Sequence, residues 1–335
     1  MFIPDKIIID EKAMDYEMGK KVFKEFKNTK TEIIIRKGGR VTELGKMAPF
    51  DAYKFGKKIL VVGIRKESKF QSCKPSANYQ LPLVSGCMGM CEYCYLQTQF
   101  GKRPYVKVYA NIEDTLKQAA GYLDESPDEI MIFEGAATSD PIPIEPYTGI
   151  LKTSIEFFAN KENSKFRFVS KYNDVESFIG INHNRKTTIR FSINTNRVIG
   201  RYEHKTTTLE ERIEAARMVS NSGYPIGFII APVFIYDGWE KEYSYLMHYI
   251  KAHLNNAYIK FEVISHRYTS RAKENILNVF PNTKLVFSEE ERQFKYGQFG
   301  YGKYVYNKEK LKSIKEFFNN NLINLFGEES INYII

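Results

Sequence analysis

The sequence lacks several features that would place it in other classes of protein. It has only four cysteines in 335 residues, so a disulfide framework is not expected. It has no apolar run of the roughly 18 residues that a transmembrane helix needs, and no repeat or low-complexity tail. Its first residues, MFIPDKIIIDEK, carry charges where a signal peptide has an apolar stretch. We therefore expect a cytoplasmic protein without a membrane segment.

The charge balance permits a polyanionic partner. The chain has 49 basic and 40 acidic residues, a net charge of +9, and an aromatic content of 14%. Cationic side chains displace the counterions condensed on nucleic acids, and aromatic rings can stack on bases. Most rings in a chain with 43% hydrophobic residues nevertheless fill a core, so composition alone does not assign a nucleic-acid partner.

Strand-like and helix-like patterns alternate between residues 104 and 264. This alternation is typical of βαβ units and a parallel sheet, and it fits either a barrel or a doubly wound sheet. A cysteine-rich loop after the apolar run Leu81–Val84 favours a barrel with its chemistry at the C-terminal strand ends. The predicted strands are Tyr105–Ala110, Glu129–Phe133, Lys165–Val169, Thr188–Ile193, Pro225–Pro232 and Tyr258–Ile264, and the predicted helices are Ile112–Leu123, Thr148–Ala159, Val175–Ile179, Leu209–Ser220 and Trp239–His253.

The two ends of the chain have a different pattern, so we predict three regions. Residues 1–75 form a small N-terminal α/β cap, 76–285 the barrel, and 286–335 a C-terminal hairpin and helix. Turn glycines in a basic, aromatic segment indicate the hairpin. The patterns behind these predictions are Ile7–Ile9, Tyr16–Phe26 and Glu32–Ile35 for the cap, and Phe294–Tyr306 and Lys308–Asn319 for the C-terminal region.

Three of the four cysteines, Cys87, Cys91 and Cys94, are spaced CxxxCxxC. Three thiolates at this spacing can hold a [4Fe–4S] cluster and leave one iron open, whereas most electron-transfer clusters are closed by four cysteines. S-adenosylmethionine (SAM) could chelate the open iron through its amino and carboxylate groups. The alternative is a zinc site, but structural zinc usually takes four ligands in two pairs, and no second pair is present.

The cysteine spacing, with an aromatic residue before the last cysteine, resembles the signature of the radical SAM superfamily. Longer strings resemble spore photoproduct lyase, a family within it. They are spread over residues 60–306, so the likeness covers most of the chain. The strings are KPSANYQLPLVSGCMGMCEYCYLQT (Lys74–Thr98), FEGAATSD (Phe133–Asp140), RFVSKY (Arg167–Tyr172), RFSIN (Arg190–Asn194), GFIIAPVF (Gly227–Phe234), GWE (Gly238–Glu240) and GKYVY (Gly302–Tyr306).

The resemblance implies a fold, a reaction and partners. The fold would be a partial (β/α)6 barrel. The reaction would be repair of 5-thyminyl-5,6-dihydrothymine to two thymines by a 5′-deoxyadenosyl radical, with a [4Fe–4S] cluster and SAM as cofactors. The partners would be double-stranded DNA carrying the lesion, flipped out of the duplex, and an unidentified one-electron reductant. The protein would act as a monomer in the spore core or the germinating cell.

The resemblance also implies roles for individual residues. Tyr95 would lie near SAM and relay hydrogen, and Tyr93 would line the same pocket. SAM would be contacted at strand ends, and the lesion by a turn and by the C-terminal hairpin acting as a wedge. The expected SAM contacts are Glu134, Gly135, Ala136, Lys171, Ser192 and Asn194, and the expected lesion contacts are Ser139, Asp140, Lys295, Gln298, Phe299 and Lys303.

The sequence departs from the family at one position that bears on the reaction. Relatives usually have a hydrogen-donating cysteine in the string that reads FEGAATSD here, where this chain has Ala137. Either the chain is an engineered variant or the thiol comes from elsewhere. Cys73 is the one remaining cysteine, and we favour it as the donor. The hairpin departs too, with Gln298 and Phe299 where relatives often have Arg and Tyr.

Two other functions stay open at this point. One is a radical SAM enzyme with another substrate, such as a methylthiotransferase or a peptide-modifying enzyme, although these often carry further cysteines for auxiliary clusters. The other is a non-catalytic, zinc-stabilised nucleic-acid-binding protein.

Overall fold

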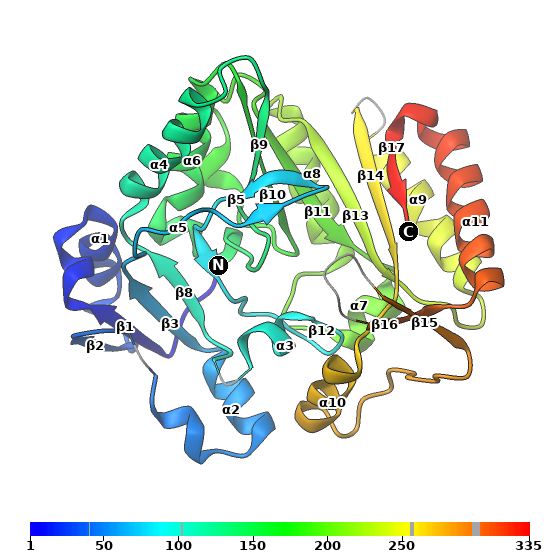
Figure 1. The fold of residues 1–335 in the computed structure, drawn as a ribbon, viewed down its shortest axis with the longest axis horizontal. Coiled ribbons are helices and arrows are strands. Elements are labelled where there is room, and N and C mark those ends of the chain that lie inside the picture. The colour runs from blue at the N-terminus through cyan, green and yellow to red at the C-terminus, as the bar shows by residue number, and fades with distance from the viewer. Residues whose placement is uncertain (40, 102, 255–257, 297–301) are drawn as a thin grey trace.

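Two main sheets organise the chain (Figure 1). The computed structural model describes residues 1–39, 41–101, 103–254, 258–296 and 302–335. The larger sheet has eight strands in the order β17-β14-β13-β11-β10-β9-β5-β4, and the smaller has five in the order β2-β1-β3-β8-β6. The larger sheet curls into an open half-barrel with helices along its outer side, so the predicted partial barrel is confirmed.

The half-barrel is built from parallel strands that the sequence pattern predicts well. All six predicted strands form, with ends that shift by one or two residues, and five of them join this sheet. Strand β17 extends the sheet in parallel with β14, while β5 pairs in parallel with β9 and β4 is antiparallel to β5. The strands are β4 (Ser72–Cys73), β5 (Ala77–Gln80), β9 (Met131–Glu134), β10 (Ser164–Ser170), β11 (Thr187–Ile193), β13 (Ile226–Val233), β14 (Ile259–Ser265) and β17 (Ile331–Ile334).

The smaller sheet contains the predicted cap strands together with two strands from further along the chain. Its central strand β3, with the sequence ILVVG, is wholly buried, as expected of a parallel strand covered on both faces. Strands β6 and β8, from beyond residue 75, join this sheet, and β4, from before residue 75, joins the half-barrel. The two sheets therefore do not separate at the predicted boundary between cap and barrel. How the chain divides into domains stays a prediction. The strands are β1 (Lys6–Asp10), β2 (Glu32–Arg36), β3 (Ile59–Gly63), β6 (Val84–Ser85) and β8 (Val106–Tyr109).

The helices agree with the periodic segments, with three differences. The predicted helix Thr148–Ala159 begins later, as α6 at Ile150, because Gly149, at φ +68°, separates it from the preceding helix α5, which ends at Thr148. The predicted helix Val175–Ile179 is only a 3-10 turn, Glu176–Phe178, and α11 runs past its predicted end. The helices are α1 (Glu17–Phe26), α2 (Pro49–Gly56), α3 (Leu96–Phe100), α4 (Ile112–Asp124), α5 (Glu145–Thr148), α6 (Ile150–Ala159), α7 (Asn196–Tyr202), α8 (Leu209–Asn221), α9 (Trp239–His253), α10 (Ser270–Val279) and α11 (Lys308–Phe326).

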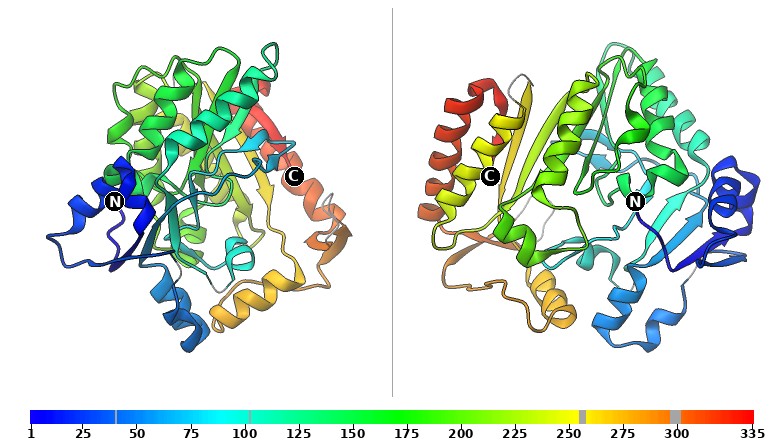
Figure 2. Two further views of the ribbon diagram at one scale, coloured as in Figure 1. Left: turned by 60° about the vertical axis from the view of Figure 1, so that its left-hand side comes forward. Right: turned by 180° about the vertical axis from the view of Figure 1, so that it is seen from behind.

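One hydrophobic core runs through both sheets. It includes Ile7 and Val62 of the smaller sheet and Phe133 and Phe228 of the larger one, all fully buried. The views in Figures 1 and 2 show the two sheets side by side, with α9 and α11 at the end of the half-barrel away from the smaller sheet. Among the described helices, none combines the length and the apolarity needed to cross a lipid bilayer.

Candidate active site

The cysteine loop lies at the C-terminal ends of the half-barrel strands. Within it, the short strand β7 (Met90–Cys91) pairs antiparallel with β12 (Glu203–His204), which follows α7, so Cys91 lies opposite Glu203. The ammonium group of Lys57 donates a hydrogen bond to the carbonyl of Cys87, and the Gly89 amide donates to the Cys87 sulfur at 3.3 Å. Two separate parts of the chain therefore fix the loop.

The three thiols have the chemistry of iron–sulfur cluster ligands. Cys91 is buried, Cys87 and Cys94 are partly buried, and none of them is in a disulfide. Thiolate sulfur is the usual protein ligand of such clusters, and burial raises the pKa of the Cys87 thiol to about 12, so a thiolate there needs a cationic partner. Within the described residues, no three His, Cys, Asp or Glu side chains are grouped closely enough to hold a single metal ion.

A buried hydroxyl without a partner lies next to this loop. The backbone of Ser139 pairs with Gly86, directly before Cys87, and the Ser139 hydroxyl has no hydrogen-bond partner among the described residues. An unpaired buried hydroxyl costs free energy, so it is suited to receive a ligand. The predicted contact between Ser139 and the lesion stays a prediction.

Tyr95, Ala137 and Cys73 lie around the same point. The Tyr95 hydroxyl donates to the carbonyl of Ala137 at 2.5 Å. Burial of the hydroxyl, followed by the charges of Cys94, Glu134 and Cys73, raises the pKa of Tyr95, a residue that as a whole is 59% exposed. Cys73 is half-buried on β4, and burial, followed by the Glu134 charge, raises its pKa. Cys73 and Tyr95 are thus both influenced by the charge of Glu134, and the role of Cys73 as hydrogen donor stays a prediction.

The Glu134-Gly135-Ala136 segment is fixed by protein contacts. The Glu134 carboxylate accepts from Arg167 at 3.1 Å, from Arg190, and from the Ala136 amide at 3.3 Å. A Cβ on Gly135 would lie 2.8 Å from the Phe166 ring, so only glycine fits there. The segment follows β9 as expected, and its contact with SAM stays a prediction.

Lys171 and Tyr93 share a buried carboxylate that the sequence did not single out. Lys171 donates to Glu203 at 2.8 Å and to the Tyr93 hydroxyl at 3.1 Å, and Tyr93 donates to Glu203. Arg212, fully buried, lies 2.8 Å from the other Glu203 oxygen. Burial alone would raise the pKa of Glu203, but Lys171 and Arg212 lower it to about 2. Nothing in the sequence pattern links these residues.

Three other predicted residues lie at the strand ends with protein partners. The Asn194 amide donates to the carbonyl of Pro232 and accepts from the Tyr243 hydroxyl, both at 2.8 Å. The Ser192 carbonyl accepts from Arg212. Asp140 accepts from the Ser170 hydroxyl at 2.6 Å and from the Lys171 amide at 2.9 Å, and burial raises its pKa to about 7. Asp140 therefore holds the turn after β9, and its predicted contact with the lesion stays a prediction.

The C-terminal hairpin forms, and its base is anchored to the half-barrel. Strands β15 (Arg292–Tyr296) and β16 (Gly302–Tyr306) pair antiparallel, with Lys295 opposite Lys303. Arg292 donates to the carbonyl of His266 at 2.7 Å, and its guanidinium lies 3.7 Å from the Tyr306 ring centroid. The sequence did not single out Arg292 or His266. Two predicted lesion contacts, Gln298 and Phe299, lie outside the described residues.

Comparisons with known proteins agree with this geometry. The family model described as spore photoproduct lyase matches residues 2–335. The spore photoproduct lyase of Clostridium acetobutylicum is 52% identical over 98% of this chain and 98% of its own, and that of Bacillus subtilis is 40% identical over 99% and 98%. A solved spore photoproduct lyase complexed with dinucleoside spore photoproduct has a TM-score of 0.94 at 37% identity, covering 100% of this chain and 99% of its own. A variant with bound AdoMet and the same dinucleoside has a TM-score of 0.94 at 38% identity, with the same coverage. The chain belongs to the spore photoproduct lyase family.

Proposed function

We propose that this protein repairs the spore photoproduct, 5-thyminyl-5,6-dihydrothymine, in DNA and restores two thymines. The observation that carries the proposal is the overlap of the whole chain with lyases solved with AdoMet and the dinucleoside lesion. The three-cysteine loop at the strand ends adds the chemistry that such a reaction requires. Family membership also favours the iron–sulfur cluster over zinc, and the lyase over another radical SAM activity.

The cofactors supply the radical, and the protein supplies the positions. Cys87, Cys91 and Cys94 would hold a [4Fe–4S] cluster, which with SAM supplies the 5′-deoxyadenosyl radical that removes hydrogen from the lesion. The unpaired Ser139 hydroxyl is available to bind the lesion. The ammonium group of Lys171, held by Glu203, puts a fixed positive charge close to the cluster loop, where it can attract an anionic group such as the SAM carboxylate.

Cys73 would return hydrogen to the thymine radical. The S–H bond breaks, the hydrogen atom forms the new C–H bond, and the unpaired electron remains on the sulfur. Tyr95, with its hydroxyl at Ala137, would be the next hydrogen donor. The solved variant with AdoMet has one cysteine changed to alanine and one serine to cysteine, at positions as far apart in its sequence as Cys73 and Ala137 are here. That correspondence supports relocation of the donor over an engineered loss.

The partners follow from the same proposal. The substrate would be duplex DNA, with the basic hairpin that carries Lys295 and Lys303 at the lesion. A one-electron donor would reduce the cluster. The protein would act as a monomer in the cytoplasm of the spore or germinating cell.

The test is a repair assay with defined substrates. Anaerobically reconstituted and reduced protein, given SAM and an oligonucleotide that contains the spore photoproduct, should release thymine pairs detectable by chromatography. The matched control is the triple change Cys87→Ala, Cys91→Ala and Cys94→Ala, which should bind no iron and repair nothing. If the wild-type protein forms 5′-deoxyadenosine with SAM yet restores no thymine, the proposed substrate is wrong.

A further inference from the structure

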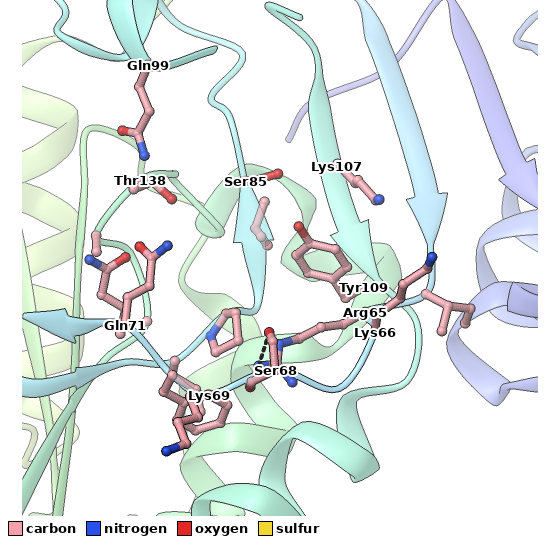
Figure 3. A pocket seen from close by; sticks show the side chains of 18 residues that line it. Arg65, Lys66, Ser68, Lys69, Gln71, Ser85, Gln99, Lys107, Tyr109 and Thr138 are labelled. Atoms are coloured by element: carbon pink, nitrogen blue, oxygen red, sulfur yellow. Dashed lines mark hydrogen bonds between the residues drawn. The ribbon is translucent and has the colours of Figure 1, made fainter. Parts of the chain in front are cut away.

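A cavity of about 460 Å³ lies between the two sheets, beside the turn that contains Ala137 (Figure 3). The segment from Ile64 to Gln71, which connects the smaller sheet to the half-barrel, forms one wall. Strand β8 contributes Lys107 and Tyr109, and helix α3 contributes Gln99. The volume lies in the range of ligand pockets.

The lining of this cavity has one sign of charge. Of the 18 residues that line it, four are cationic, namely Arg65, Lys66, Lys69 and Lys107, and none is Asp or Glu. A cavity lined by one sign of charge concentrates ligands of the opposite sign.

The four cationic side chains differ in their contacts with the rest of the protein. Arg65 donates to Gln118 and to the Ser68 carbonyl, so it shapes the wall. The Lys107 ammonium lies 5.1 Å from the Tyr109 ring centroid, and burial lowers its pKa. Lys66 and Lys69 are exposed, with no ion pair or side-chain hydrogen bond to any of the described residues. These two lysines can therefore bind a ligand without breaking an interaction within the protein.

The cavity adjoins the reacting region. Gly135, Ala137 and Thr138 line it, and the carbonyl of Ala137 is bonded to Tyr95, which follows the last cluster cysteine. A DNA strand whose damaged bases lie beside Tyr95 and Ala137 would therefore pass next to this cationic cavity.

We propose that this cavity binds the phosphodiester backbone of the damaged strand next to the lesion, with Lys66 and Lys69 as the phosphate contacts. The inference rests on the proposed function and extends it to a second DNA-binding surface, separate from the hairpin. Lysine contacts to phosphate fix the register of a strand without reading its bases. A thymine pair would be a poor occupant, since neutral bases gain little from four cations.

The test compares two substrates that differ in their flanking phosphates. In the double variant Lys66→Ala/Lys69→Ala, binding to lesion-containing DNA at about 0.1 M salt should weaken by roughly tenfold for each lysine removed, and the slope of log K against log salt should fall by about one per lysine. Repair of the dinucleoside lesion, which has no flanking backbone, should be unchanged. Both lysines are exposed, so the fold should tolerate the change.

The matched control is Lys312→Ala/Lys315→Ala, which removes the same charge from α11 on the other side of the molecule (Figure 1). It should leave DNA binding within about twofold of wild type. Equal loss of dinucleoside and DNA repair in the cavity variant would overturn the proposal, because the lysines would then serve the reacting site. Unchanged DNA binding by the Lys66→Ala/Lys69→Ala variant would also overturn the proposal. This holds even if inorganic phosphate binds the cavity of the wild-type protein. If no lesion is repaired by any form but the cavity variant alone loses DNA affinity, the proposed function fails and the DNA surface stands.

Discussion

At the scale of single residues, two side chains have clear consequences for the chemistry and the stability of the site. Cys73 is the proposed hydrogen donor in a chain whose Ala137 offers no thiol. Glu203 is a carboxylate buried between two cations and a tyrosine. Substitution of Cys73 tests the proposed reaction. Substitution of Glu203 tests which interactions hold the cysteine loop in place.

Replacing Cys73 by alanine should separate radical formation from clean repair. The variant should still consume SAM and lesion, but the thymine radical should be quenched by other reductants, so that by-products exceed thymine. Chromatography with mass spectrometry measures that ratio. Adding Ala137→Cys should restore thymine as the main product, because it returns a thiol to the other side of the same site. Clean repair by Cys73→Ala alone would exclude this thiol as the donor.

Glu203→Gln should destabilise the protein by about 3–5 kcal/mol, because Lys171 and Arg212 would keep their buried charges without a counterion. The pKa of Glu203 in the folded protein is about 2, against an ordinary value of 4.5. Its contribution is therefore fully present above pH 4.5 and is lost as the pH falls toward 2. Urea unfolding should give a constant difference from wild type between pH 8 and 5.

The control for that change is Glu214→Gln, which breaks an exposed ion pair with Arg217. Exposed pairs contribute about 0–1 kcal/mol, so the midpoint should hardly move. Equal effects of the two changes would mean that burial of the Glu203 charge adds nothing.

At the scale of elements, the hairpin β15–β16 is anchored to the half-barrel through the residues at its base. Arg292 donates to the carbonyl of His266 and lies 3.1 Å from the His266 Nδ1, and it packs on Tyr306. Burial, followed by the Arg292 charge, lowers the pKa of His266 to about 3. His266 therefore stays neutral and can accept from Arg292. We expect insertion of the hairpin at the lesion to depend on these contacts of Arg292 with His266 and Tyr306.

Arg292→Lys should loosen the hairpin while leaving the half-barrel folded. Lysine keeps the charge but loses the forked hydrogen bonds and the flat contact with Tyr306. Hydrogen exchange should rise in β15 and β16, and repair in duplex DNA should fall at least several-fold. Repair of the dinucleoside lesion should be nearly unchanged, since it needs no flipping. An equal loss of repair for duplex DNA and for the dinucleoside would contradict this role of the hairpin.

At the scale of the whole molecule, the C-terminal strand β17 is part of a network of buried charged side chains that crosses the half-barrel. The Tyr333 hydroxyl on β17 donates to Glu262 at 2.8 Å. Glu262 pairs with Arg190, and Arg190 pairs with Glu134. The end of the sequence is thereby connected to the strand end beside the cluster loop.

Removing residues 331–335 should destabilise the fold by several kcal/mol, because an edge of the sheet and part of this buried network are lost together. Tyr333→Phe, the control, removes one hydrogen bond and should cost about 1 kcal/mol. Chemical denaturation measures both. Equal losses would show that the strand contributes only through its hydroxyl.

Local pattern was enough to predict much of this protein. The alternation of strand and helix predicted a parallel sheet, because a parallel strand buried on both faces has a continuous apolar run and an outer helix has a 3.6-residue period. The choice of a partial barrel came from the family resemblance. The three cysteines were predicted because their ligand spacing is contiguous in sequence. The family strings added the expected roles of Tyr95 and Ser139, whereas Cys73 was proposed because it is the one cysteine left once Ala137 replaces the usual donor.

Only the tertiary structure brought together groups that are distant along the chain. Glu203 meets Tyr93 and Lys171, and Arg292 meets His266, through pairings between short strands and loops that carry no periodic signal. The cavity between the sheets is likewise a product of packing, since its lysines come from segments that are ordinary in sequence. Periodicity and ligand spacing are local properties of a chain, whereas a buried ion pair or a charged cavity exists only once the sheets have packed.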